Sequence, residues 1–215
     1  MLIAIDGIDG AGKTTLAQNL KRVFTCLDPL IEKEPTEYST WGKRLKESAE
    51  IGRLPRELEL DYFHRDRVEH IRKVIKPALE GRRLVILDRY IDSTLAFQAD
   101  DVADAEHLYE RFLPEILVAN FTFILDCNPE VGLERISRTR PSRSKFERID
   151  TLRKAESIYR SRQGPTYHHV NAMVSVSETL SQVLAILSKH SPKLKRVIAG
   201  GTGIRCSNSK RRAEA

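Results

Sequence analysis

The 215-residue chain has few cysteines, a single tryptophan and no long apolar run. Its three cysteines are odd in number and far apart, which fits a reducing cytosol better than a disulfide framework. No Cys/His cluster has the spacing of a zinc site. No apolar run approaches the ~20 residues of a membrane span, and no secretory leader is recognisable at the start. We therefore expect a cytoplasmic protein that does not enter membranes.

Most of the chain also lacks a charge imbalance. The formal net charge is +6, but residues 191–215 hold seven of the 36 basic side chains and one of the 30 acidic ones. The first 190 residues are therefore neutral, with 29 of each sign. Because 191–215 is also interrupted by glycine and serine, we expect a basic, disordered extension after a single domain over 1–190. Because nucleic-acid binding relies on an excess of basic side chains, the neutral charge of residues 1–190 argues against a nucleic-acid partner.

Short apolar runs alternate with helix-like segments along the body. The predicted strands are 2–6, 29–35, 83–88, 121–127 and a last one near 170–176. The predicted helices follow the glycines to about residue 24 and then cover 39–52, 56–81, 129–138, 146–162 and 177–190. Continuous apolar strands separated by helices predict an α/β fold with a parallel sheet covered on both faces. Ligands of such sheets bind beyond the carboxyl ends of the strands.

One glycine-rich segment follows the first predicted strand. Residues 7–14, GIDGAGKT, match the pattern G-x-x-x-x-G-K-[ST], and we call them the phosphate loop. Glycines let backbone N–H groups converge on phosphate oxygens, and the helix that follows directs its positive dipole end at the same anion. A purely structural glycine turn is the alternative, but the strand-loop-helix context favours a nucleoside triphosphate site. The predicted phosphate-binding residues are Gly7, Asp9, Gly10, Ala11, Gly12, Lys13, Thr14 and Thr15.

Lys13 supplies a point charge for the β- and γ-phosphates, and the Thr14 hydroxyl can ligate Mg²⁺. Asp88 and Arg89 follow the third strand, where a planar guanidinium can bridge two phosphoryl groups. A plain surface ion pair would explain the same two residues. Phe63 and Arg67 lie four apart in a predicted helix and share one face, where they could stack on a base and donate to its edge. A core aromatic is the alternative there.

An arginine-rich segment, about residues 135–147, has several basic residues in a short stretch. Such runs are usually solvated faces. A mobile segment with several arginines is also what a phosphoryl-transfer site needs to close and neutralise developing charge. We call this segment the predicted lid.

With these motifs in place, the chain resembles the thymidylate kinases (dTMP kinases) from residue 1 to about residue 190. The likeness is carried by IDGIDGAGKTT, KEPT, the F-x-x-x-R helix, DRYIDSTLAFQ, LDCNPEVGLERI and the predicted lid. The resemblance implies a doubly wound five-stranded parallel sheet and a homodimer. It also implies transfer of the γ-phosphate from MgATP to dTMP.

The resemblance further implies a role for each matching residue. Contacts with the thymine, sugar and phosphate of dTMP fall to Asp9, Phe63, Arg67, Arg89, Thr94, Phe97 and Gln98. Arg67 would read the O4 atom of thymine, and Asp88 with Thr14 would position the metal. Because the phosphate loop contains no arginine, the catalytic cations would be Lys13 and Arg89 together with Arg138, Arg140 and Arg143 of the predicted lid.

Two departures from the family pattern affect these roles. The family often has REPGG where this chain has KEPTE, so Lys33 replaces an arginine and loses a bidentate grip on phosphate. Many members have tyrosine where this chain has Phe97, so deoxyribose and ribose could be distinguished differently.

Two other functions remain open from the sequence. A deoxynucleoside kinase would resemble the chain around Asp88 and Arg89, but it needs a carboxylate base, for which Asp9 or Glu34 could serve. A nucleotide-binding protein without kinase activity could associate with nucleic acid through the basic residues of 191–215.

Overall fold

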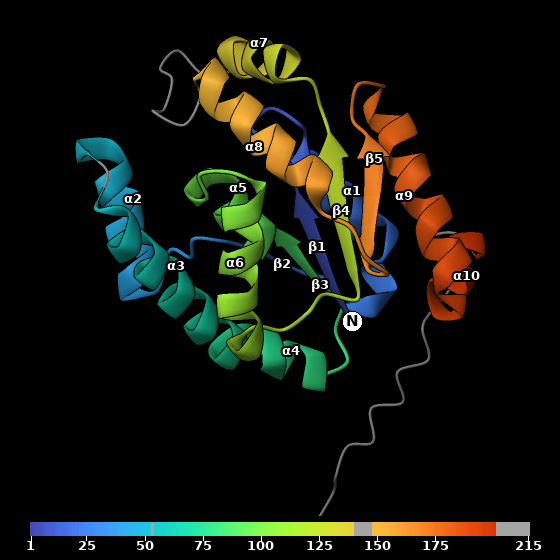
Figure 1. Cartoon of the computed structure of the whole chain (residues 1–215). Coiled ribbons are helices and arrows are strands. Elements are labelled where there is room, and N and C mark those ends of the chain that lie inside the picture. Colours follow the sequence, from blue (N-terminus) through green and yellow to red (C-terminus); the bar gives the residue numbers. More distant parts are fainter. Residues whose placement is uncertain (53, 140–147, 201–215) are drawn as a thin grey trace, which may run out of the picture.

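A five-stranded, wholly parallel sheet forms the centre of the molecule. The computed structural model describes residues 1–52, 54–139 and 148–200. The strands are β1 (Leu2–Asp6), β2 (Leu30–Lys33), β3 (Val85–Asp88), β4 (Phe121–Asp126) and β5 (Tyr167–Asn171), in the order β2-β3-β1-β4-β5 (Figure 1). Helices cover both faces of the sheet. The predicted α/β fold with five parallel strands is confirmed.

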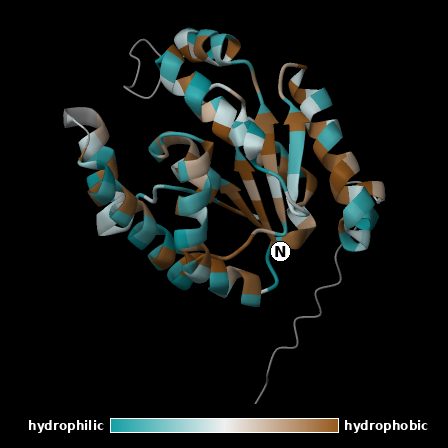
Figure 2. Cartoon of the chain, viewed as in Figure 1, coloured by the Kyte–Doolittle hydropathy of each residue, from teal (hydrophilic) through white to brown (hydrophobic). Residues whose placement is uncertain are grey.

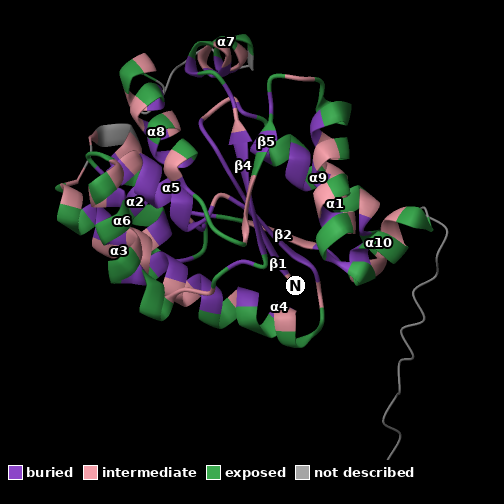
Figure 3. Cartoon of the chain, turned by 45° about the vertical axis from the view of Figure 1, so that its right-hand side comes forward, coloured by how far each residue is buried: buried purple, intermediate pink, exposed green. Residues whose placement is uncertain are grey.

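The strand sequences explain this layering. Every residue of β1 and β3 is buried. Figure 2 shows the hydrophobic colouring of the central strands, and Figure 3 shows β1 as buried. The parallel register pairs Ile5 with Asp88, so the carboxyl ends of β1 and β3 lie side by side. β5 begins three residues earlier than predicted, because its partly exposed edge residues are polar. Val176, assigned to that strand from the sequence, instead starts a helix.

The helices largely follow the predicted segments. Their bounds are α1 (Lys13–Val23), α2 (Thr40–Ile51), α3 (Arg56–His70), α4 (Lys76–Glu80), α5 (Ile91–Gln98), α6 (Val102–Phe112), α7 (Pro129–Thr139), α8 (Ile149–Ser161), α9 (Val176–His190) and α10 (Pro192–Ala199). Single 3₁₀ turns cover Thr25–Leu27 and Leu113–Glu115. α5 and α6 were not predicted as helices. Among the described helices, none has the length and apolar character needed to cross a membrane.

The long helix predicted over 56–81 contains a π-helical turn. Residues Ile71–Ile75 adopt this wider turn between α3 and α4. The proline ring of Pro77 would clash with the preceding turn of a regular α-helix. The wider turn lies where that crowding would occur, and it lets the helix continue to Glu80, with Gly81 as its C-cap.

The prediction that the disordered extension starts at residue 191 is wrong. Residues 192–199 form α10, which packs against α9, and the Ser191 side chain caps its first turn. Leu194 is fully buried, and Val197 and Ile198 pack against the core. These apolar residues at i, i+3 and i+4 form one face of the helix. The prediction missed this face because it considered only the overall basic composition of the segment. The remainder of the predicted extension, 201–215, lies outside the described residues.

Candidate active site

The phosphate loop joins β1 to α1 at the carboxyl edge of the sheet. Gly10 has φ +81°, and a Cβ atom there would lie 2.2 Å from the carbonyl oxygen of Gly132 on α7. Glycine is therefore required at position 10 both for the backbone conformation and for contact with α7. Gly12, at φ +97°, is the N-cap of α1, and a Cβ there would meet no protein atom within 4 Å. Protein atoms therefore leave open space beside Gly12 at the start of α1, the end of a helix at which backbone N–H groups have no partner within the helix.

Lys13 is held over this loop by backbone carbonyls. Its Nζ donates to the oxygens of Gly7 at 2.8 Å and Ile8 at 2.7 Å, and the side chain is 6% exposed. Burial, followed by the positive charge of Arg89, lowers the pKa of Lys13 to about 8. An anion bound at the loop would favour the charged ammonium and restore its pKa.

Two candidate oxygen ligands for a metal, from Thr14 and Asp88, lie at the end of the phosphate loop. The Thr14 hydroxyl donates to Asp88 Oδ2 at 2.5 Å, and Asp88 Oδ1 is buried with no hydrogen-bond partner among the described residues. Hydroxyl and carboxylate oxygens are hard ligands of the kind that Mg²⁺ prefers. The described residues contain no group of three or more His, Cys, Asp or Glu side chains that could hold a metal alone. The pair fits a metal ion whose other ligands come from phosphates and water.

Arg89 adopts a strained backbone next to this pair. Its φ is +79°, a value that costs energy for a residue with a Cβ atom, and its N–H donates to Ile5 O at 3.0 Å. The guanidinium is ion-paired with Asp9. This conformation brings the cation from the end of β3 back over the phosphate loop, between two of the cavities described next.

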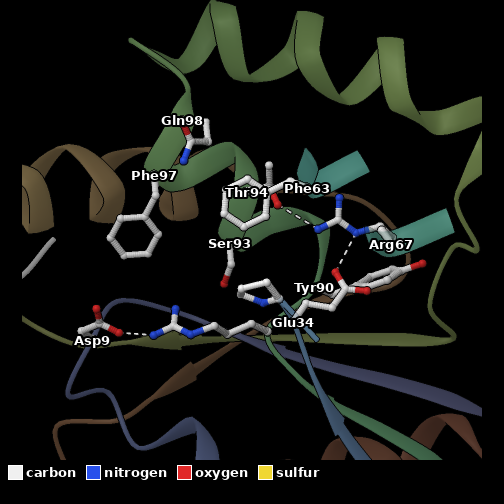
Figure 4. A pocket seen from close by; sticks show the side chains of 11 residues that line it. Asp9, Glu34, Phe63, Arg67, Tyr90, Ser93, Thr94, Phe97 and Gln98 are labelled. Carbon is white, nitrogen blue, oxygen red and sulfur yellow. Dashed lines mark hydrogen bonds and ion pairs between the residues drawn. The ribbon is translucent and has the colours of Figure 1, made fainter. Parts of the chain in front are cut away.

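Beside the loop lies a cavity of about 190 Å³, named here the Phe63 cavity (Figure 4). The structure brings seven predicted residues to its walls: Asp9, Phe63, Arg67, Arg89, Thr94, Phe97 and Gln98. Three lining residues were given no role from the sequence, Pro35, Tyr90 and Ser93, and Glu34 was considered only as the base of a nucleoside kinase. Glu34 and Pro35 lie in the KEPT motif, but no contact of either residue with dTMP was predicted. Tyr90 and Ser93 were missed because α5 was not predicted as a helix.

Arg67 is fixed at one end of the Phe63 cavity by two of its nitrogens. Nε donates to Glu34 Oε2 and Nη2 donates to Thr94 Oγ1, each at 2.8 Å (Figure 4). Nη1 is buried and has no hydrogen-bond partner among the described residues. A guanidinium can only donate hydrogen bonds. Arg67 therefore keeps one hydrogen-bond donor unused at the wall of the Phe63 cavity.

Thr36, one of the residues at which KEPTE departs from the family pattern, binds Asp66 through its side chain. Asp66 on α3 accepts from the Thr36 backbone N–H at 2.8 Å, from the Thr36 hydroxyl at 2.5 Å and from the Ser39 hydroxyl. A glycine at position 36 could not make the hydroxyl contact. Asp66 thus holds the segment that carries Glu34, and Glu34 in turn holds Arg67.

Two further cavities continue from the first. The loop cavity, about 280 Å³, lies over the phosphate loop and is also lined by Lys33, Asp88 and Arg135. It shares Asp9 and Arg89 with the Phe63 cavity. The Val174 cavity, about 350 Å³, lies beyond the loop between Leu16 and the start of α9, and it shares Gly10, Gly12, Thr15 and Arg135 with the loop cavity. Three adjoining cavities therefore run along the carboxyl edge of the sheet.

The predicted lid arginines divide between described and undescribed residues. Arg138 lies on the outer side of α7, pairs with Glu134 at 2.5 Å and is not among the residues lining these three cavities. Its assignment to the site is not supported by its position. Arg140 and Arg143 lie outside the described residues. Arg135 takes the inner position and donates to Ala172 O at 3.0 Å. Helical spacing could have indicated this, because Arg135 shares a face with Gly132, which contacts the loop.

The sequence is similar to one family throughout most of its length. A family model described as "Thymidylate kinase" matches residues 5–183. The "Thymidylate kinase" of Xanthomonas euvesicatoria pv. vesicatoria is 39% identical over 194 residues, which cover 87% of this chain and 83% of that protein. That of Xanthomonas campestris pv. campestris (strain B100) is 38% identical over 191 residues, covering 87% and 82%. That of Xylella fastidiosa is 35% identical over 195 residues, covering 87% and 90%.

Proposed function

The chain belongs to the thymidylate kinase family, and on that premise we propose that it transfers the γ-phosphate of ATP to dTMP, giving dTDP. The observation that carries the proposal is the row of three cavities, with the phosphate loop between a base-sized cavity and a mostly apolar one. Two nucleotides bound end to end would place their phosphates together over the loop, beside Lys13 and Arg89.

The Phe63 cavity would take the thymine base. Arg67 Nη1 would donate to the O4 carbonyl, while Phe63 offers a ring face for stacking. Cytosine has an amino group at that edge, so two donors would face each other and dCMP would bind poorly. The Val174 cavity would take the adenine between Leu16, Val174 and Val176.

The phosphates would need alignment and charge neutralisation rather than a base. The second pKa of a phosphate monoester is about 6, so the attacking oxygen of dTMP is mostly ionised at neutral pH. Lys13, Arg89 and the loop amides offset the repulsion between donor and acceptor. Lys33 lines the loop cavity, where it could contact the acceptor phosphate as a point charge. The roles of Arg140 and Arg143 stay predictions.

The proposal includes Mg²⁺, held by Thr14 and Asp88 together with the ATP phosphates. The bound ion would neutralise charge on the transferring group. The protein contributes the orientation of the two oxygens, because Thr14 lies in the first turn of α1 and Asp88 ends β3. It further includes a cytoplasmic homodimer, which rests on the resemblance alone. Sedimentation of the purified protein tests the dimer.

The structure weakens the case for the deoxynucleoside kinase alternative. Glu34 already accepts from Arg67 and lies 3.0 Å from His70 Nδ1, and Asp9 is paired with Arg89. Both candidate bases for a nucleoside hydroxyl are therefore engaged with cationic or ring nitrogen partners.

A substrate panel tests the proposal. Purified protein with MgATP is given dTMP, dCMP or thymidine, and ADP and the phosphorylated product are measured, with Lys13→Met as the inactive control. We expect dTDP from dTMP, much less product from dCMP and none from thymidine. Product from thymidine but not from dTMP would establish the nucleoside kinase instead. Salt-sensitive nucleic-acid binding without any phosphoryl transfer would favour the non-kinase alternative.

A further inference from the structure

A chain of buried hydroxyl groups joins α5 to β1 and to α8. Ser93, in the first turn of α5, lines the Phe63 cavity. Its Oγ donates to Asp6 Oδ1 at 2.5 Å and lies 3.0 Å from the hydroxyl of Tyr159. Asp6 ends β1 and directly precedes the phosphate loop, whereas Tyr159 lies on α8. Asp6 and Tyr159 are 0% and 2% exposed, so water does not compete for these bonds.

The direction of the hydrogen bonds follows from chemistry. An ionised carboxylate only accepts, so the single hydroxyl hydrogen of Ser93 goes to Asp6, and Tyr159 must donate to Ser93 Oγ. Burial, followed by the nearby Asp6, raises the pKa of Tyr159 well above its usual value, so the phenol keeps its proton. The Tyr90 backbone N–H also donates to Asp6 Oδ1, at 3.2 Å. Ser93 is thus fixed from both sides, with its hydrogen directed away from the cavity.

These hydrogen bonds hold α5, the helix that carries much of the acceptor site, that is, the proposed dTMP site. Thr94, Phe97 and Gln98 lie on α5, and Arg89 comes two residues before it. Asp6 is covalently joined to the phosphate loop on the donor side. Phosphoryl transfer needs reacting atoms about 3–3.5 Å apart, and a misplacement of about 1 Å can cost ~100-fold in rate. A link between β1 and α5 therefore bears directly on the geometry of transfer.

We propose that Tyr159 is a positioning residue for phosphoryl transfer, which through Ser93 and Asp6 fixes the first turn of α5 against the phosphate loop. The proposal rests on the proposed function and deepens it. Tyr159 is not among the residues that line the three cavities, so it acts through Ser93 and not by touching a nucleotide.

A second tyrosine, half-buried, gives a control. The Tyr167 hydroxyl of β5 donates to Asp92 Oδ1 at 3.1 Å, and Arg162 Nε donates to the same oxygen at 2.8 Å. Asp92 lies in the same turn of α5 as Ser93 but does not line the Phe63 cavity. Tyr167→Phe therefore also removes a hydroxyl contact with α5, together with the bond that this hydroxyl accepts from Arg162 Nη2 at 3.0 Å, without releasing a residue of the acceptor site.

The experiment compares wild type, Tyr159→Phe, Tyr167→Phe and Ser93→Ala. Melting temperatures and steady-state kinetics with MgATP and dTMP are measured for each. We expect both Phe variants to melt at similarly reduced temperatures. Tyr159→Phe loses about tenfold in kcat, with the KM for ATP within about twofold of wild type, whereas Tyr167→Phe keeps kcat within about twofold. Ser93→Ala, which breaks the same chain, loses at least as much kcat as Tyr159→Phe and serves alone if that variant does not fold.

The outcomes separate two failures. An active wild type with equal kcat values for Tyr159→Phe and Tyr167→Phe overturns the positioning role and leaves the proposed function standing. A wild-type protein that does not phosphorylate dTMP overturns the proposed function, and the positioning role with it. A double variant, Ser93→Ala with Tyr159→Phe, that is no slower than Ser93→Ala alone supports one shared chain of contacts.

Discussion

Replacing Arg67 with alanine should destabilise the fold as well as weaken dTMP binding. Arg67 is 1% exposed, and its guanidinium is the charged partner of Glu34, which is 4% exposed. Arg67→Ala removes the hydrogen bonds to Glu34 and Thr94 and leaves the Glu34 carboxylate buried beside His70. Removing one partner of a buried ion pair costs about 3–5 kcal/mol. In a chain of this size each kcal/mol lowers the melting temperature by about 2–4 °C, so a fall of about 6–20 °C is expected.

The assay is a thermal melt of a double-mutant cycle, followed by circular dichroism. Glu34→Gln alone leaves Arg67 partly unpaired, but the double variant Arg67→Ala, Glu34→Gln carries no buried charge at this place. We expect the double variant to be less destabilised than the sum of the two single variants, by about 1 kcal/mol or more. Thr94→Val is the milder companion: it keeps the ion pair, removes one orienting contact of Arg67 and should raise the KM for dTMP more than that for ATP.

A melting temperature for Arg67→Ala within about 2 °C of wild type would refute this reasoning, because it would mean that water reaches Glu34 in the variant. Strict additivity in the cycle would refute it as well, since Arg67 and Glu34 would then not act as a pair.

Three further predictions concern Asp6, Gly10 and the C-terminal helix. Burial, and to a smaller extent the charge of Asp92, raises the pKa of Asp6 from 3.8 to about 6. The contribution of Asp6 to the unfolding free energy is therefore fully present below pH 3.8 and is lost as the pH rises through about 6. Relative to Asp6→Asn, wild type should therefore gain up to about 3 kcal/mol in unfolding free energy between pH 7 and pH 4, measured by urea titration. Gly10→Ala should lower kcat/KM for ATP about a hundredfold, because the new Cβ would clash with Gly132. Gly81→Ala should leave kcat/KM unchanged, because its Cβ would lie 3.4 Å from the nearest atoms, the carbonyl oxygens of Pro77 and Ala78. Truncation after His190 should lower the melting temperature by about 3–12 °C through loss of buried Leu194, and truncation after Gly200 should leave it unchanged.

Each of these has a contrary result. A pH-independent difference between wild type and Asp6→Asn would show that Asp6 titrates normally. Equal activity of the two glycine variants would show that the phosphate loop can move away from α7. Equal melting of the two truncations would show that α10 contributes nothing to the core.

The sequence by itself determined the features whose physics is local. A phosphate loop needs glycines, a lysine and a threonine at fixed spacing, and all of them are consecutive in the chain. The buried strands β1, β3 and β4 are continuous apolar runs, so they were recognisable, whereas the bounds of the polar edge strand β5 were misplaced and the short helix α5 was not predicted. The family resemblance followed from several such local motifs taken together.

Only the tertiary structure decided which distant residues meet. Arg67 is joined to Glu34, 33 residues earlier, and to Thr94, 27 residues later, by the packing of α3 against the sheet and α5. Arg135 faces the phosphate loop and Arg138 does not, because the close approach of Gly132 to the loop fixes how α7 is turned. Leu194 becomes core only when α10 folds back on α9. The spacing of residues along the chain does not predict these contacts, because they depend on the register of the sheet and the rotation of the helices. Both are set by many weak packing interactions together.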